Sequence, residues 1–175
     1  VDNSNFGLET ASNVPGDDPS DTIIKDNFDK VATGLVAGNV NVKNNSRFGV
    51  YQSAEATVNG DITATNGGIV SAYNSGAALT VKGDVNVSDK LSRLETGNIG
   101  SIDVAGKVAV ENGATAYIGK KGTISASKGF SVNNATLEIE NGKLVLSGED
   151  AVLDLTQGGV LKTDEAGSIE LEKGA

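Results

Sequence analysis

The three tyrosines of the chain recur at a regular spacing, and they are the first residues whose chemistry suggests binding. Tyr51 and Tyr73 are 22 residues apart, and Tyr117 follows 44 residues later. The intervening and following positions of this expected outward row are Glu95, Glu138 and Leu161. Aromatic rings that repeat along one face can stack on sugar rings or be buried against another subunit. The same pattern fits a cross-strand stripe that only stabilises a sheet, so both interpretations stay open.

Carboxylates are the second group that could carry chemistry. A polysaccharide hydrolase or lyase needs two or three acids that converge in one groove. Asp61 and Asp84 share one expected corner, with Lys107 next in the same row, and Glu138 and Glu140 share one strand face. Both sets fit solvated faces. We therefore predict that the chain is not an enzyme, and a tailspike-like polysaccharide-degrading enzyme is the less favoured alternative.

A third acidic group near the N-terminus consists of Asp17, Asp18 and Asp21. Side-chain and backbone oxygens of this kind can hold calcium, although no calcium-loop motif is present. No other cofactor is expected. The sequence has no His, Cys, Met or Trp, which excludes imidazole acid–base catalysis, thiolate chemistry and the usual zinc sites.

Charge and composition limit the partners and the location. The net charge of −9, from 14 basic and 23 acidic residues, argues against a nucleic-acid-binding groove. No segment approaches the roughly 20 apolar residues of a membrane-spanning helix. Because the sequence starts with Val1 rather than Met, we expect a cleaved product or an excised fragment, and removal of a secretory signal is the simplest account. This predicts an extracellular or cell-surface location.

The elements that would position these residues form a repeat. Apolar residues return every 22 or 23 positions at Val40, Ile62, Val85, Val108, Phe130 and Leu153. A second apolar row runs through Ala56, Leu79, Ile102, Ile124, Leu144 and Ile169, and a third through Val50, Ala72, Leu94, Ala116, Leu137 and Val160. Apolar and polar residues alternate around each position, as in half-buried strands, and Gly and Asn-Gly pairs separate them.

These rows predict an all-β fold, a parallel β-helix of about six coils with three short strands each, over residues 36–175. Like positions of successive coils lie above one another in such a solenoid, which explains a fixed period of this length. An antiparallel meander also uses Asn-Gly turns and is the alternative. A meander does not, however, require one class of side chain to recur at a constant interval.

The two ends of the predicted solenoid differ. Residues 1–20 contain both prolines and lack periodicity, so we expect an extended arm. Residues 21–35 fit an amphipathic helix that caps the first coil, with apolar positions Ile24, Phe28, Val31 and Leu35. The last strand, which carries Ile169 and Leu171, has no cap after it. Its open edge suggests pairing with a second copy, head to tail.

Several coils resemble a known family in style. The segments VKGDVNV at 81–87, VAGKVAV at 104–110 and ATLEIENGKLVLSG at 135–148 resemble the β-helical stalks of bacterial autotransporter passengers and related cell-surface adhesins. The resemblance covers residues 36–175 and implies a right-handed, exported and mostly non-enzymatic solenoid. The chain is shorter than such passengers, and we do not expect a membrane-anchoring barrel within it.

The functional expectation is a homo-oligomeric structural protein that assembles head to tail into an extracellular fibre or matrix. The alternative is an adhesin that binds a glycan or host surface through Tyr51, Tyr73 and Tyr117.

Overall fold

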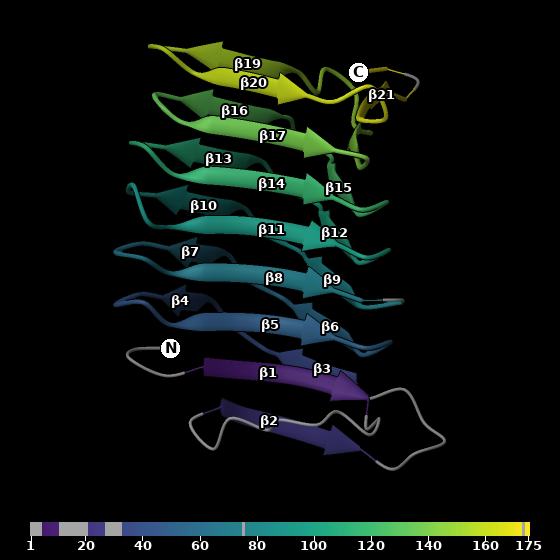
Figure 1. Cartoon of the computed structure of the whole chain (residues 1–175). Helices are drawn as coiled ribbons and strands as arrows, with labels where there is room; N and C mark the ends of the chain where they lie inside the picture. Colours follow the sequence, from purple (N-terminus) through teal and green to yellow (C-terminus); the bar gives the residue numbers. More distant parts are fainter. Residues whose placement is uncertain (1–4, 11–20, 27–32, 75, 173) are drawn as a thin grey trace.

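The computed structural model describes residues 5–10, 21–26, 33–74, 76–172 and 174–175. Within this part of the chain every regular element is a β-strand, and all strand pairs are parallel. The strands wind into a β-solenoid of about six coils with three strands per turn (Figure 1). The predicted fold class is therefore confirmed.

Three sheets form the walls of the solenoid, and consecutive strands of each coil come from sheets 1, 2 and 3 in turn. Sheet 1 has the order β2 (Asp21–Asp26), β1 (Asn5–Thr10), β5 (Arg47–Tyr51), β8 (Ile69–Tyr73), β11 (Arg93–Gly97), β14 (Thr115–Gly119), β17 (Thr136–Glu140) and β20 (Val160–Thr163). Sheet 2 has the order β3 (Thr33–Val36), β6 (Glu55–Val58), β9 (Ala78–Val81), β12 (Ser101–Val104), β15 (Thr123–Ala126), β18 (Lys143–Leu146) and β21 (Ser168–Leu171). Sheet 3 has the order β4 (Val40–Val42), β7 (Ile62–Ala64), β10 (Val85–Ser88), β13 (Val108–Glu111), β16 (Phe130–Asn133) and β19 (Leu153–Thr156).

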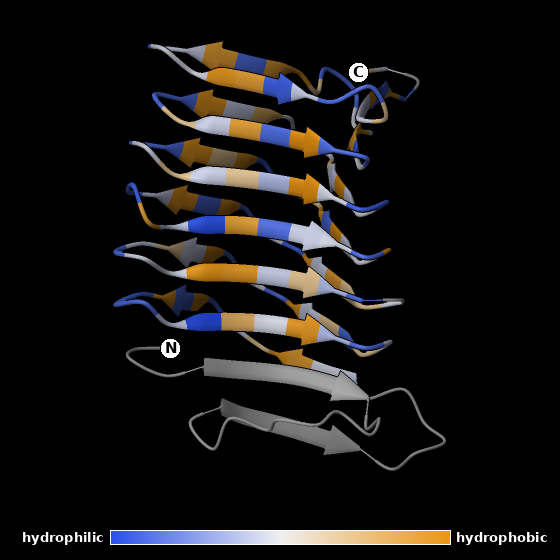
Figure 2. Ribbon diagram, in the orientation of Figure 1, coloured by the Kyte–Doolittle hydropathy of each residue, from blue (hydrophilic) through white to orange (hydrophobic). Residues whose placement is uncertain are grey.

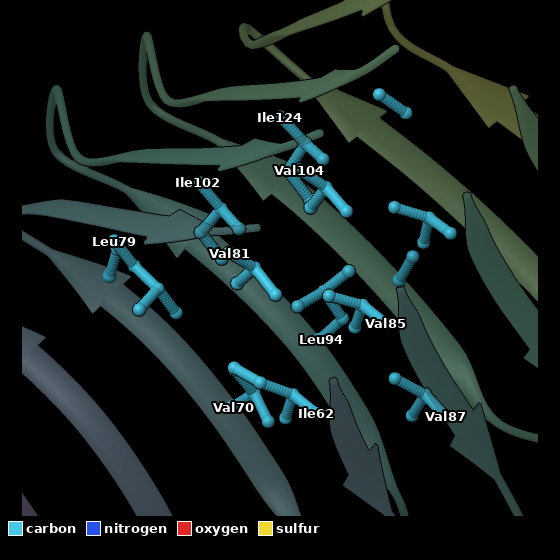
Figure 3. Close-up of a cluster of buried hydrophobic side chains, with 14 of the residues drawn as sticks. Ile62, Val70, Leu79, Val81, Val85, Val87, Leu94, Ile102, Val104 and Ile124 are labelled. Atoms are coloured by element: carbon cyan, nitrogen blue, oxygen red, sulfur yellow. The ribbon is translucent and has the colours of Figure 1, made fainter. Parts of the chain in front are cut away.

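The core is a thin column of small and β-branched side chains, and all three sheets contribute to it. Apolar and polar residues alternate along most strands (Figure 2). The apolar residues of this alternation are mostly buried. Leu79, Ile102 and Ile124 occupy the same position in successive coils and are fully buried (Figure 3). Each coil thus buries its apolar side chains against the coils above and below it, which is what a repeat of this length requires.

The strand registers confirm two of the three predicted apolar rows. In sheet 3, Val85 pairs with Ile62 on one side and with Val108 on the other. In sheet 2, Ile102 pairs with Leu79 and Ile124 in the same way. The spacing in the sequence was therefore sufficient to place these strands.

The predicted rows of sheet 1 are wrong in part. Val50 pairs with Ala72 as expected, but Ala72 then pairs with Thr96 rather than with Leu94. Val160 points outward, and the inward partner of Leu137 is Leu161. The register from β8 to β11 advances 24 residues, from Ile69 to Arg93. Five residues separate Val87 from Arg93, whereas four separate its register partner Ala64 from Ile69.

The predicted capping helix over residues 21–35 is also wrong in the parts of this range that the structure describes, 21–26 and 33–35. Asp21–Asp26 is strand β2, which contains Ile24, and Thr33–Val36 is strand β3, which contains Leu35. Phe28 and Val31 lie outside the described residues. Two physical reasons favour strands: the run Thr22-Ile23-Ile24 is β-branched, and a strand satisfies the open backbone edge of a sheet, which a helix cannot do.

The predicted arm over residues 1–20 contains a strand as well. Strand β1 lies between β2 and β5, so these three strands are not stacked in chain order. Phe6 of β1 is in register with Phe48 of β5, and Gly7 with Gly49. In sheet 1, β1 therefore pairs with β5 on one side, and β2, which follows β1 in the chain, pairs with its other side.

Candidate functional site

The tyrosines lie on the outward face of sheet 1, but they do not form one row. Tyr51 of β5 pairs directly with Tyr73 of β8. Tyr73 then pairs with Gly97, whereas Tyr117 of β14 pairs with Glu95, two residues further back along the strand. The prediction of a single row that includes Leu161 is therefore wrong, since Leu161 is on the inward face.

Each tyrosine ring packs over a glycine of the same sheet. Side chains added at these glycines would collide with the rings, and the pairs are Gly49 with Tyr51, Gly97 with Tyr73, and Gly119 with Tyr117. At Gly97 an added Cβ would lie 2.9 Å from Cε1 of Tyr73. Rings that cover glycines in this way shield exposed strand backbone and stabilise a sheet. This contact supports the structural stripe among the two interpretations.

A buried carboxylate is at the centre of the same face. Glu95 is only 7% exposed although it points outward from β11. Its Oε1 lies 3.0 Å from Nη1 of Arg47, and its Oε2 lies 3.4 Å from Nε of Arg93. Each carboxylate oxygen thus has a cationic partner, which offsets the cost of removing the charge from water.

Hydroxyl groups extend this network across three strands. The Tyr51 hydroxyl lies 3.1 Å from the Ser71 hydroxyl, and Arg47 Nη1 donates to both oxygens at 3.4 Å. Burial works to lower the pKa of Arg47, but Tyr51 and Glu95 outweigh it, so the pKa is raised above its ordinary value. Burial, and next the charge of Glu95, raise the pKa of Tyr73. Arg47, Ser71, Tyr51 and Glu95 are therefore one connected polar cluster.

A separate contact engages the third tyrosine. The Tyr117 hydroxyl donates to Oε2 of Glu140 at 2.6 Å. This hydrogen bond raises the pKa of Tyr117 to about 12. The Glu138 and Glu140 pair, which the sequence suggested as a solvated face, thus contributes one acceptor to the tyrosine face.

The corner carboxylates bind backbone rather than each other. Oδ1 of Asp61 accepts the N–H of Asp84 at 2.8 Å, and Oδ1 of Asp84 accepts the N–H of Lys107 at 2.8 Å. Asn39 starts the same row by accepting the N–H of Asp61 at 2.9 Å. Each side chain satisfies the turn of the next coil. The arrangement connects successive coils and does not bring acids together around a groove.

The described residues contain no cluster of three or more acidic side chains that could hold a metal. Asp21 begins β2, and Asp17 and Asp18 lie outside the described residues, so the calcium prediction is untested.

An open hollow of 490 Å³ lies at the corner between sheets 1 and 2. It is lined by Asn74, Asn98, Ile99, Lys120, Lys121 and Asn141.

The last coil exposes apolar side chains that are buried in the coils before it. Leu146 of β18 is fully buried, whereas its register partner Leu171 of β21 is 61% exposed. Ile169, at the other predicted edge position, is 37% exposed, although its partner Leu144 is fully buried. The predicted edge residues are therefore exposed on the last described coil.

The residues that sequence reasoning missed are Arg47, Ser71 and Arg93. Arg47 and Arg93 are outward residues at the starts of the strands that carry Tyr51 and Glu95. A basic residue on the same strand face as a tyrosine or a glutamate is the signal that could have identified them.

Among the described residues no helix is long and apolar enough to cross a membrane.

Comparison with known proteins found no relative. No family model matches the chain, and neither a curated protein nor a solved structure matches it significantly. The function must therefore be argued from the geometry alone.

Proposed function

We propose that the chain is a non-catalytic structural protein of the cell surface or extracellular matrix that assembles head to tail through the ends of its solenoid. The observation that carries the proposal is the set of exposed apolar side chains on the last described coil. Its side chains Leu155, Leu161, Ile169 and Leu171 are each 36% to 61% exposed. They continue the buried rows of the solenoid, so another coil of the same kind would fit on them.

The gain from covering this end is of the order that an assembly needs. Complete burial of an aliphatic side chain contributes about 1.5–3 kcal/mol, so four side chains that are roughly half-exposed contribute about 3–6 kcal/mol in total. The free edges of β19, β20 and β21 would add a row of backbone hydrogen bonds in each sheet. Heterologous contacts of this kind do not close on themselves and give fibres.

The absence of converging acids among the described residues supports a structural role over catalysis. Asp61 and Asp84 are engaged by backbone, and Glu95 is neutralised by two arginines. The net charge of −9 opposes the approach of two copies, so we expect assembly to be stronger at higher ionic strength or with calcium.

Negative-stain electron microscopy and light scattering of the purified chain, with and without calcium and at low and high salt, test the proposal. The variant Ile169→Lys places a charge on the exposed end and should abolish assembly. The matched control Ser125→Lys places the same charge on the outward face of sheet 2 and should assemble normally. Monodisperse monomers of the unmodified chain under every condition would contradict the proposal.

Adhesion is the second candidate function, and one observation favours it. The rings of Tyr51, Tyr73 and Tyr117 are only half-buried, so part of each ring is available on the outward face of sheet 1. A glycan array tests this candidate with the double variant Tyr73→Ala and Tyr117→Ala. Loss of signal in the variant supports adhesion, and an array without signal for the unmodified chain refutes it.

A further inference from the structure

The hollow of 490 Å³ at the corner between sheets 1 and 2 adjoins the tyrosine face. Its lining residues come from the turns that follow four successive strands of sheet 1, namely β8, β11, β14 and β17 (Figure 1). Tyr73 directly precedes Asn74, and Gly97, over which the ring of Tyr73 lies, directly precedes Asn98. The aromatic rings and the hollow are therefore parts of one continuous surface on the side of the solenoid.

Two tyrosine rings supply an apolar surface beside the hollow. The ring of Tyr73 lies over Gly97 of β11, and the ring of Tyr117 lies over Gly119 of β14. Strands β11 and β14 are neighbours, about 4.8 Å apart, so the two rings can contact adjacent residues of one bound chain. A half-buried ring with one side against backbone presents its other side to solvent, where a sugar ring can stack on it.

Amide groups and one apolar side chain line the hollow next to these rings. Nδ2 of Asn98 donates to Oδ1 of Asn74 at 3.2 Å, which orients both amides at the corner. This bond uses one donor and one acceptor and leaves each amide further hydrogen-bonding capacity. Ile99 is 58% exposed in the same lining. Amides beside an apolar surface match the hydroxyl and C–H groups of a sugar.

The charge of the hollow favours an acidic sugar. Lys120 and Lys121 are exposed in its lining, and within the described part of the chain neither ammonium group forms a salt bridge. The carboxylates at this corner in the next two coils are engaged by the protein itself. Glu140 accepts the Tyr117 hydroxyl at 2.6 Å, and Asp164 accepts backbone N–H groups of its own turn and of the preceding coil. The two lysines are thus available to a carboxylate of a ligand.

The wider surface has the same sign of charge. The outward positions of β5, β8, β11 and β14, with the turns that follow these strands, carry four basic residues and one acidic residue, namely Arg47, Arg93, Lys120, Lys121 and Glu95. This surface is therefore positive in a chain whose net charge is −9. Glu138 and Glu140 of β17 limit it on one side, which places an anionic ligand over β8, β11 and β14.

We propose that this surface binds an acidic polysaccharide, with sugar rings stacked on Tyr73 and Tyr117 and uronate carboxylates paired with Lys120 and Lys121. The inference rests on the adhesion candidate described above and names its ligand. An acidic peptide would use the lysines without needing the rings, whereas a uronate chain uses both. The site is on the side wall of the solenoid, so assembly through the ends leaves it accessible.

Isothermal titration calorimetry with matched acidic and neutral oligosaccharides tests this inference. The acidic probes are oligomers of glucuronic acid and of galacturonic acid, and the neutral counterparts are oligomers of glucose and of galactose with the same linkages. Polyglutamate of similar length supplies the charge without the sugar rings. We expect at least one acidic oligomer to bind about tenfold more tightly than its neutral counterpart and than polyglutamate, because both the lysines and the rings contribute.

Paired variants locate the site. Lys120→Gln with Lys121→Gln should reduce the affinity for the acidic oligomer about tenfold, since both cationic partners are lost. The matched control, Lys107→Gln with Lys128→Gln, removes two exposed lysines from the corner between sheets 2 and 3 and should bind normally. Tyr73→Ala should weaken binding, whereas Tyr73→Phe keeps the ring and should not. Circular dichroism of each variant checks that the fold is retained.

The outcomes separate this inference from the proposed functions. Absence of binding for both acidic oligomers, equal binding of polyglutamate, or an equal loss in the control lysine pair would overturn it. Neutral oligomers that bind as tightly as acidic ones, with a loss in Tyr73→Ala, would overturn the acidic ligand while the adhesion candidate stands. If no oligosaccharide binds, the adhesion candidate falls as well, whereas head-to-tail assembly is decided separately by light scattering.

Discussion

The cluster around Glu95 predicts an unusually strong ion pair for the surface of a sheet. In the variant Arg47→Gln the guanidinium is lost but much of the side-chain volume is kept, and Glu95→Gln does the same for the carboxylate. A double-mutant cycle of these two changes isolates the interaction between the charged groups from the packing that each side chain also provides. The chain offers a matched control in Lys143 and Glu170, whose charged atoms are 2.9 Å apart against 3.0 Å for Arg47 and Glu95.

Burial sets the expected difference between the two pairs. The side chains of Lys143 and Glu170 are 43% and 53% exposed, so water screens them and about 0.5 kcal/mol is expected, as for other surface pairs. Glu95 has a side chain that is 9% exposed and Arg47 one that is 35% exposed. This places the second pair between a surface pair and a buried one, whose disruption costs about 3–5 kcal/mol. We expect a coupling of roughly 1–3 kcal/mol.

Urea unfolding followed by circular dichroism gives the free energies for both cycles, at about 0.1 M and about 1 M salt. The Lys143 and Glu170 coupling should decrease strongly at the higher salt concentration, whereas that of Arg47 and Glu95 should be largely retained. Equal couplings for the two pairs would refute the reasoning that burial beneath Arg47 and Arg93 strengthens the contact.

Three further predictions follow from single residues. Ile99 has a positive φ of 70°, which is strained for a β-branched residue, so Ile99→Gly should raise the free energy of unfolding by about 1 kcal/mol; a decrease in urea unfolding would contradict this. The pKa of Tyr117 is about 12, above its ordinary value of 10, so its stabilising contribution is complete below pH 10 and is lost between about pH 10 and 12. Glu140→Gln should move this titration down towards 10 in an absorbance titration with the other tyrosines replaced by Phe, and an unchanged midpoint would show that Glu140 is not the cause. The backbone N–H of Asn141, followed by those of Gly167 and Ala166, lowers the pKa of Asp164 below 3.8, so its contribution is present above that value and is lost as the pH falls below it. Asp164→Ala should therefore reduce stability at pH 6 but not at pH 2, and an equal effect at both values would contradict the hydrogen-bond explanation.

The sequence predicted the apolar rows most reliably, because the same packing interaction between neighbouring coils is repeated along each row. In sheet 3 every step is 22 or 23 residues, and each inward position must be apolar because it is packed between two coils. Val85 could therefore be aligned with Val108 from spacing alone. In sheet 1 the step from β8 to β11 is 24 residues, so Ala72 pairs with Thr96 and Tyr73 pairs with Gly97. The predicted inward row and the predicted row of tyrosines were therefore wrong by the same two residues, while the fold was confirmed.

The polar cluster could be predicted only in part for a related reason. Arg47 and Glu95 are separated by 48 residues and by the whole of strand β8, so no pairing rule for neighbouring strands connects them. Their contact passes over Ser71, whose small side chain leaves the space through which the arginine reaches. A sequence reader would need the register of three strands before that contact could be inferred.

The sequence carried a signal for strand β1, but the helical spacing of the residues that follow it obscured that signal. Residues Asn5-Phe6-Gly7-Leu8 match Arg47-Phe48-Gly49-Val50 in the pattern of Phe, Gly and an aliphatic residue, and the two segments pair in that register. They are 42 residues apart, less than two periods, so a search at the repeat length places β1 two coils away from β5 rather than beside it. The helical spacing of Ile24, Phe28, Val31 and Leu35 then gave a competing explanation for the segment between them. An exposed sheet edge has a stronger requirement than either pattern, because its backbone groups need partners. Strand β1 meets that requirement on β5, and β2 meets it in turn on the other edge of β1.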